Sequence, residues 1–268
     1  MLAFRRIRAA MSKHIALIVP CFDEAGRLDR GEILRLARAR PDLGLLLVND
    51  GSRDATLAML EQIRAEAGGS AEVLSLDRNH GKAEAVRRGL LAAIAGGARI
   101  VGWADADLST PVDELLRLPE ELERNRVDVM LASRVRLLGR QIDRHAHRHY
   151  LGRVFATFAS LALRIPVYDT QCGAKLFRVT PALAWALRTP FRTRWVFDVE
   201  LLARLLDGGP EAPPLDPSAI REEPLRVWRD VKGSKLRWSG MLRAGLQVVG
   251  LFLKRRLWPG ARAGGSRG

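Results

Sequence analysis

Short apolar runs alternate with helical patterns through the first half of the chain, and each run ends in a cluster of polar residues. Residues 15–19, 45–48, 73–76 and 100–104 are the four runs, and they predict buried strands. A helical pattern follows each strand, and this β-α alternation favours a mostly parallel sheet flanked by helices. The four polar junctions then fall at one edge of the sheet, where open α/β sheets bind ligands.

Two carboxylates, Asp105 and Asp107, come directly after the fourth predicted strand, and a helix start follows at 109–111. Hard divalent cations prefer oxygen ligands, and Mg²⁺ commonly takes one or two carboxylates together with substrate phosphates. The same spacing is also typical of a solvated loop. The order of the surrounding blocks therefore decides between the two interpretations.

Several ordered blocks resemble the family 2 glycosyltransferases of the GT-A (Rossmann-like) fold. They are Val-Pro-Cys-Phe-Asp-Glu at 19–24, Val-Asn-Asp-Gly-Ser at 48–52, Asn-His-Gly-Lys at 79–82 and Asp-Ala-Asp-Leu-Ser at 105–109. Blocks at 169–177, 194–202 and 233–236 are similar to the dolichyl-phosphate β-glucosyltransferase branch of the polyprenyl-phosphate glycosyltransferases. The resemblance covers roughly residues 14 to 240. It departs from the family at Asn49, where an acid is common, and we do not expect the N-terminal anchor that eukaryotic members carry.

The resemblance implies a nucleotide-sugar donor and a metal. Phe22 would flank the nucleobase, Asp50 would meet the base or the ribose, and Lys82 would assist at the diphosphate. The alternative for Lys82 is a solvated lysine at a helix start. Asp105 and Asp107 are the implied ligands of Mg²⁺ or Mn²⁺. The full set of expected donor-binding residues is Pro20, Phe22, Glu24, Asp50, Ser52, Lys82, Asp105 and Ala106.

A phosphate acceptor changes what the reacting centre needs. Its second pKa is about 6, so it is largely ionised at neutral pH and attacks without a base. Cations are then needed to hold two anions together. We expect Asp107, Arg134, Asp169, Gln171, Lys175 and Asp198 at the reacting centre, and Arg134, Arg194 and Lys235 at the acceptor phosphate. Asp198 as a general base is the alternative, suited to a hydroxyl acceptor.

Composition agrees with an enzyme that has one large core. The chain has 268 residues, of which 47% are hydrophobic. Its two cysteines, Cys21 and Cys172, cannot form a disulfide framework, and Cys172 is expected to be a small packed residue and not a nucleophile, because no His lies in its motif. No apolar run approaches 18 residues, so we expect no transmembrane helix.

Positive charge is concentrated at the two ends of the chain. Of the net +14, residues 1–14 carry +4 and residues 221–268 carry +9. Residues 241–258 combine Leu, Val, Phe and Trp with Lys254, Arg255 and Arg256, a pattern typical of a helix lying on an anionic membrane surface. An amphipathic helix docked on the core is the alternative. A nucleic-acid partner is not expected, because the positive segments lack a recognised binding pattern.

A second amphipathic segment covers residues 150–161. Val154, Phe155, Phe158 and Leu161 share one helical face, which predicts core packing. In the resembling family this region lies on the acceptor side, and arginines precede it. Alternating histidines at 145, 147 and 149 stand among those arginines, so we expect no metal there.

These patterns predict an α/β fold in three parts: a basic extension (1–13), a GT-A domain (14–235) and a basic amphipathic membrane-surface segment (236–268). Residues 14–110 would bind the nucleotide sugar and residues 111–235 the acceptor. We expect an inverting transfer of glucose from UDP-glucose to a polyprenyl phosphate by a peripheral protein at the cytoplasmic membrane face. The alternatives are GDP-mannose as donor, a non-lipid acceptor, and a non-catalytic nucleotide-sugar-binding protein.

Overall fold

A computed structural model of the chain describes residues 12–143 and 146–231, without the side chains of 146–151. The predicted C-terminal segment and Lys235 therefore lie outside the described residues. The strands are β1 (Ile15–Cys21), β2 (Leu43–Asn49), β3 (Ala71–Ser75), β4 (Ile100–Trp103), β5 (Val129–Ser133), β6 (Gln141–Ile142), β7 (Lys175–Arg178), β8 (Ile220–Pro224) and β9 (Val227–Trp228). The four strands predicted from sequence all form, and their ends differ from the prediction by at most two residues.

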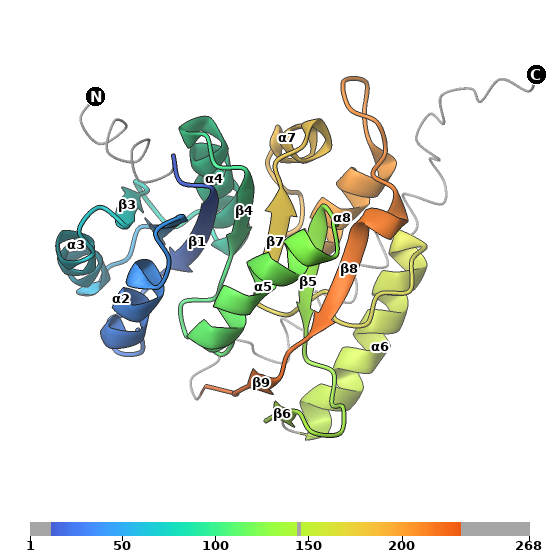
Figure 1. Cartoon of the computed structure of the whole chain (residues 1–268), viewed down its shortest axis with the longest axis horizontal. Coiled ribbons are helices and arrows are strands. Elements are labelled where there is room, and N and C mark those ends of the chain that lie inside the picture. Colours follow the sequence, from blue (N-terminus) through green and yellow to red (C-terminus); the bar gives the residue numbers. More distant parts are fainter. Residues whose placement is uncertain (1–11, 144–145, 232–268) are drawn as a thin grey trace, which may run out of the picture.

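Seven strands form one sheet in the order β3-β2-β1-β4-β7-β5-β8 (Figure 1). β7 runs antiparallel to both of its neighbours, whereas all the other pairs are parallel. The short strands β6 and β9 pair separately. The mostly parallel α/β sheet predicted from the alternation is confirmed, and both halves of the chain contribute to it.

Helices cover both faces of the sheet. They are α2 (Arg30–Arg38), α3 (Thr56–Glu66), α4 (Lys82–Gly96), α5 (Val112–Arg124), α6 (Ala146–Leu163), α7 (Pro181–Leu187) and α8 (Phe197–Asp207), with a 3₁₀ turn at Pro217–Ala219. One apolar cluster joins the sheet to α4, α6, α7 and α8, and a second joins it to α2, α3 and α5. Alternate residues of β1 enter different clusters, as a strand buried on both faces requires.

The packing of α4 fixes the position of its first residue, Lys82. A Cβ added at Gly89 would lie 2.7 Å from a methyl group of Ile18 and 3.1 Å from one of Val48. The missing side chain therefore lets α4 approach β1 and β2 closely. The helix start is held above the carboxyl ends of these strands.

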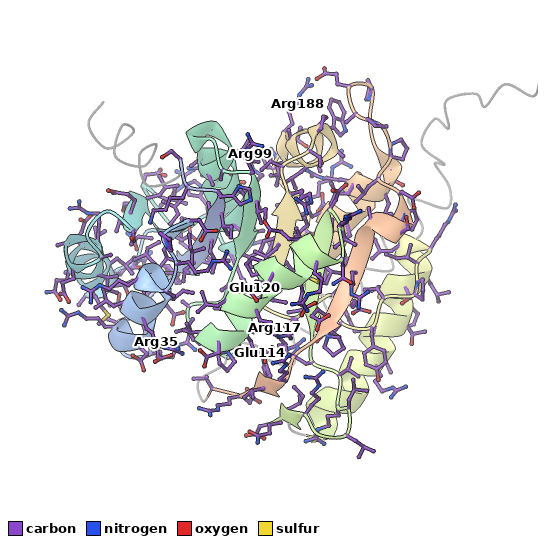
Figure 2. All side chains as sticks on the ribbon, in the orientation of Figure 1. Arg35, Arg99, Glu114, Arg117, Glu120 and Arg188 are labelled. Carbon is purple, nitrogen blue, oxygen red and sulfur yellow. The ribbon has the colours of Figure 1, made fainter. Side chains whose placement is uncertain are left out.

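A buried ion-pair network fixes the far edge of the sheet. Arg117 on α5 contacts Glu223 of β8 at 2.6 Å and Glu114 of its own helix at 2.8 Å. Figure 2 labels Arg117 and Glu114 on α5. The network attaches β8 to α5, and it fixes Glu222 next to the loop that precedes β7.

Candidate active site

The loops after β2 and β3 are joined by the carboxylate of Asp50. Its two oxygens accept hydrogen bonds from the backbone N–H groups of His80 and Gly81, each at 2.8 Å. Burial raises the pKa of Asp50, although these N–H donors oppose the rise. A Cβ added at Gly51, whose φ is +65°, would lie 2.5 Å from the Arg78 Cα, so the two loops can approach only with glycine there. Asp50 is 2% exposed, and its expected contact with the nucleoside stays a prediction.

The loop after β1 is attached to the loop after β2. The Asp23 N–H donates to Ser52 Oγ (3.1 Å), and the Glu24 N–H donates to Thr56 Oγ1 (2.8 Å). Glu24 also forms a bidentate ion pair with Arg27, with Nε–Oε2 at 2.8 Å. Pro20 and Phe22 are both half-buried at this edge of the sheet.

The acidic pair follows β4, as predicted. Asp105 Oδ1 accepts from Lys82 Nζ at 2.5 Å. Asp107 Oδ1 accepts from the backbone N–H (3.0 Å) and the hydroxyl (2.8 Å) of Ser109, which fixes its orientation. Ala106 is buried between the two acids.

Lys82 is the cation that lies among these acids. Burial alone would lower the pKa of Lys82, but Asp105, and then Asp198 and Asp107, raise it above its ordinary value. The Lys82 side chain is 44% exposed, so it is partly buried and partly open to solvent. Three acids, two from the loop after β4 and one from the start of α8, are therefore close enough to act on one ammonium group.

Gly173 packs directly against Asp105. A Cβ added at Gly173 would lie 2.5 Å from the Asp105 carboxyl carbon. The loop before β7 is therefore pressed on the acidic pair, and a side chain at this position would displace the Asp105 carboxylate. This brings the second-half block at 169–177 into the site formed by the first half.

Arg134 and Asp169 form a second anchored pair. The guanidinium binds the carboxylate in a fork, with Nε–Oδ2 at 2.7 Å and Nη2–Oδ1 at 2.8 Å. The N–H groups of Tyr168 and Asp169 donate to the carboxylate of Glu222 (2.7 and 2.6 Å). Arg134 also lies 5.3 Å over the ring of Trp228. Burial lowers the pKa of Arg134, but Asp169 raises it by more, so the guanidinium stays charged.

Asp198, at the start of α8, contacts Gln171 and Lys175. Gln171 Nε2 donates to Asp198 Oδ1 at 2.6 Å. Lys175 Nζ lies 3.4 Å from Oδ2 and donates to the Cys172 carbonyl at 2.5 Å. Burial raises the pKa of Asp198, and Lys175 and Lys82 oppose that rise. Lys175 is only 1% exposed, so in this structure its ammonium is covered and holds Asp198 and the Cys172 carbonyl.

The remaining predicted cation, Arg194, lies on the other side of the site. Its Nη2 would be 3.1 Å from a Cβ at Gly81, the residue before α4. Arg194 therefore packs on the loop expected to contact the donor, although the sequence suggested the acceptor phosphate. Its ligand stays a prediction.

The donor set suits a divalent cation that also binds phosphate. No group of three or more His, Cys, Asp or Glu side chains suited to a metal occurs in the described part of the chain. Two carboxylates are nevertheless sufficient when a diphosphate supplies the other oxygens. Asp105 and Asp107 fit this requirement, since they stand two residues apart at a sheet edge that also carries Lys82.

Three contributors to the site were missed by sequence reasoning. Glu222 and Trp228 contact Asp169 and Arg134 from β8 and β9, and they carry no motif. Arg27 binds Glu24, and Asp107 is among the groups that raise its pKa, after its hydrogen bond to Glu24. The spacing of three residues from Glu24 was the one signal that could have identified Arg27.

The segment between Arg134 and Asp169 carries six of the eight large apolar side chains exposed in the described residues. On α6, Val154 (56%), Phe158 (46%) and Leu161 (55%) are exposed, and the other three are Leu137, Leu138 and Tyr168. Residues 135–168 also contain six arginines and a single acid.

The prediction of core packing on α6 is therefore wrong for three of its four residues. Phe155 alone packs, half-buried, against the core, which α6 meets mainly through Ala156, Ala159, Ala162 and Leu163. Small residues let the helix lie close to α8, while Val154, Phe158 and Leu161 point outward. No helix among the described residues is long and apolar enough to cross a membrane.

Comparisons with known proteins agree with this arrangement. A family model described as glycosyl transferase family 2 matches residues 16–183. A dolichyl-phosphate beta-glucosyltransferase of Drosophila melanogaster is 31% identical over 88% of this chain and 74% of that protein. One of Trichomonas vaginalis is 28% identical over 91% of this chain and 73% of that protein.

The fold is also found among solved structures. Glucosyl-3-phosphoglycerate synthase from Mycobacterium tuberculosis, in complex with Mn²⁺, uridine diphosphate and glucosyl-3-phosphoglycerate, superposes with a TM-score of 0.63. It is 19% identical, over 94% of this chain and 83% of that one, which establishes the shared GT-A fold. Family model, relatives and fold agree: the chain is a glycosyltransferase and belongs to glycosyl transferase family 2.

Proposed function

We propose that this glycosyltransferase moves glucose from UDP-glucose to a polyprenyl phosphate, with inversion at the sugar. The observation that carries the proposal is the segment between Arg134 and Asp169, whose ends are joined by a forked ion pair. Between these ends lie exposed apolar side chains and an excess of arginine. An acceptor with an anionic head and an apolar tail complements this combination, because arginines attract the phosphate and apolar side chains contact the tail. The names of the similar proteins, which specify dolichyl phosphate and glucose, support it.

On the donor side, Phe22 and Asp50 would contact the nucleoside, and Lys82 would contact the diphosphate. Asp105 and Asp107 would hold Mg²⁺ or Mn²⁺, which supplies positive charge for the leaving nucleotide. In the chain itself, Lys82 already lies 2.5 Å from Asp105. When Asp105 binds another partner, the Lys82 ammonium can therefore donate its hydrogen bond to an oxygen of a bound phosphate instead.

On the acceptor side, the reaction needs no proton to be removed at neutral pH. A phosphate monoester with a second pKa of about 6 is already a nucleophile. Arg134 would hold it, since Asp169 keeps the guanidinium charged and oriented. Asp198 is committed to Gln171 and Lys175, so we assign it to positioning the loop before β7.

A lipid acceptor also requires the enzyme to reach a membrane surface. The exposed residues Val154, Phe158 and Leu161 form one stripe on α6, and Arg153 and Arg164 lie at its sides. Apolar insertion combined with cationic attraction is the usual basis of binding to an anionic interface. We therefore propose a peripheral protein at the cytoplasmic face, held by this stripe together with the basic segment 236–268.

The test is a donor screen with one polyprenyl phosphate. UDP-glucose, UDP-galactose, UDP-N-acetylglucosamine and GDP-mannose are each supplied with Mg²⁺ or Mn²⁺, and the lipid product is identified by mass spectrometry. The proposal predicts a hexosyl-phosphate lipid from UDP-glucose at a rate well above the others. Preference for GDP-mannose would replace the donor assignment, and absence of any lipid product would overturn the function.

A further inference from the structure

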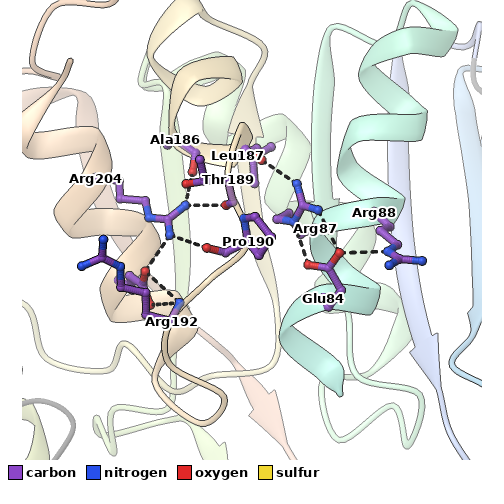
Figure 3. Close-up of polar contacts among 10 residues, drawn as sticks. Glu84, Arg87, Arg88, Ala186, Leu187, Thr189, Pro190, Arg192 and Arg204 are labelled. Carbon is purple, nitrogen blue, oxygen red and sulfur yellow. Dashed lines mark hydrogen bonds and ion pairs between the residues drawn. The ribbon is translucent and has the colours of Figure 1, made fainter. Parts of the chain in front are cut away.

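The linker between α7 and α8, residues 188–196, is folded around one ion pair on α8. Arg204 Nη2 lies 2.7 Å from Glu200 Oε1, one helical turn away. The guanidinium also donates to three backbone carbonyls (2.7–2.8 Å), those of Ala186, Thr189 and Pro190 (Figure 3). The first half of the linker is therefore held by Arg204.

Glu200 holds the second half. Its carboxylate accepts from the N–H groups of Arg192 (3.0 Å) and Thr193 (2.9 Å) and from the Thr193 hydroxyl (2.8 Å). Burial would raise the pKa of Glu200, but these donors and Arg204 bring it below its ordinary value. The Glu200 carboxylate is therefore buried, ionised and surrounded by hydrogen-bond donors.

The residue that follows these contacts is Arg194. Its guanidinium lies against Gly81, one residue before Lys82 on α4. The start of the linker is attached to the same helix, because Arg87 donates to the Leu187 carbonyl at 2.9 Å (Figure 3). The linker is thus attached to α4 near its start, to α8 through Arg204 and Glu200, and again to the beginning of α4 through Arg194.

We propose that Glu200, supported by Arg204, is a positioning residue that holds Arg194 beside Lys82, where both cations bind the diphosphate of the donor. The inference rests on the proposed function, because it takes a nucleoside diphosphate sugar as the ligand. Asp198 and Glu200 occupy the same helix two residues apart. The start of α8 therefore contacts the loop before β7 through Asp198 and the donor side through Glu200.

Replacing Glu200 with glutamine keeps the shape and removes the charge. In either orientation, the new amide NH₂ would face groups that can only donate. These are the backbone N–H groups of Arg192 and Thr193 or the Arg204 guanidinium. Residues 192–196 should then loosen, and Arg194 should move from Gly81. Displacement of about 1 Å at a binding group can cost up to about 100-fold, so we expect binding of UDP with Mn²⁺ to weaken by about tenfold or more.

The experiment is a double-mutant cycle on the full chain, measured by calorimetric titration with UDP and Mn²⁺. The four proteins are wild type, Glu200→Gln, Arg194→Ala and the double variant. If Glu200 acts through Arg194, Glu200→Gln should weaken binding in the wild-type background and change it less than twofold once Arg194 is absent. Equal losses in the two backgrounds, or wild-type binding by Glu200→Gln, would overturn the inference.

Two further variants keep the result interpretable. Thr193→Val removes a single hydrogen bond to Glu200, and it replaces Glu200→Gln in the test if that protein does not fold. It should weaken UDP binding slightly, in the same direction. Unchanged binding by a folded Thr193→Val protein would then count against the inference. Glu211→Gln breaks an exposed ion pair with Arg188 (2.8 Å), a residue of the same linker, and should leave UDP binding unchanged. Arg188 lies away from the site, at the outer end of α7 (Figure 2).

The outcome is distinguishable from failure of the proposed function, because binding of UDP requires no acceptor. A wild-type protein that binds UDP but transfers nothing to polyprenyl phosphate leaves the role of Glu200 intact. A wild-type protein that binds GDP in place of UDP changes the donor, and the cycle is then measured with GDP. A protein that binds neither nucleotide contradicts both proposals.

Discussion

Replacing Gly173 with alanine tests whether the position of Asp105 governs activity. The added methyl group would lie 2.5 Å from the Asp105 carboxyl carbon. Carbon atoms in favourable contact are about 3.5–4.0 Å apart, so the carboxyl group must move by roughly 1 Å. The φ of Gly173 is outside the left-handed region, so alanine adds no backbone strain.

The cost should fall on activity and not on the fold. Overpacking a closed core costs about 1–3 kcal/mol, but the Asp105 side chain is about one-third exposed and can swing toward solvent. A 1 Å shift of a group that binds the reacting substrate can reduce the rate by about 100-fold. That corresponds to about 2.7 kcal/mol of transition-state stabilisation.

The assay compares kcat/KM for UDP-glucose at saturating polyprenyl phosphate, across a Mn²⁺ titration, with Tm as the measure of folding. Gly26→Ala is the matched control, because no heavy atom lies within 4 Å of its added Cβ and its φ is also outside the left-handed region. We expect a loss of about 100-fold for Gly173→Ala and none for Gly26→Ala. If Gly173→Ala retained activity within twofold of wild type, the assignment of Asp105 to the site would be refuted.

Four further outcomes are expected. Asp107→Asn should remove most turnover at an unchanged Tm, and near-wild-type activity in a metal titration would contradict its role as a ligand. Asp198→Asn should reduce the rate by less than about 100-fold, the smallest loss expected when a general base is removed. The pH–rate profiles of wild type and Asp198→Asn should both show an apparent pKa of about 6, that of the acceptor phosphate. Complete loss of activity in a folded Asp198→Asn protein would instead indicate a carboxylate base. Phe158→Asp should weaken sedimentation with anionic vesicles. Leu57→Asp, at a site on α3 that is 37% exposed against 46% for Phe158, should not. Equal effects would exclude the α6 stripe. Because the folded pKa of Glu200 is lowered, its stabilisation is present above the ordinary pKa of about 4.3 and is lost as pH falls through the folded value. The Tm difference between wild type and Glu200→Gln should therefore be largest at neutral pH and shrink in acid, and a constant difference would argue against the charge.

Elements set by local pattern were predictable from the sequence. Residues 15–19 and 100–104 are short apolar runs ended by polar residues and followed by helical patterns. Their shortness and these boundaries favour buried strands, and β1 and β4 form there. Parallel pairing then requires their polar ends to meet, so the gathering of Asp50, Lys82 and Asp105 at one edge followed from the alternation alone.

Contacts set by the tertiary fold were not predictable. The fork between Arg134 and Asp169 joins residues 35 apart, and the approach of Gly173 to Asp105 depends on β7 entering the sheet antiparallel beside β4. No periodicity encodes either contact. The α6 face was predicted wrongly for a related reason: helical spacing identifies an apolar stripe, but it does not tell whether the core or something outside the chain covers Phe158.

A comparison of three acceptors tests whether the acceptor is a lipid phosphate. Polyprenyl phosphate, the corresponding polyprenol and 3-phosphoglycerate are each incubated with UDP-glucose and Mn²⁺, and the products are analysed by ³¹P and ¹H NMR. We expect a β-linked glucosyl phosphodiester with polyprenyl phosphate and no product with the other two. Transfer to the polyprenol hydroxyl, or faster transfer to 3-phosphoglycerate than to the lipid, would contradict it.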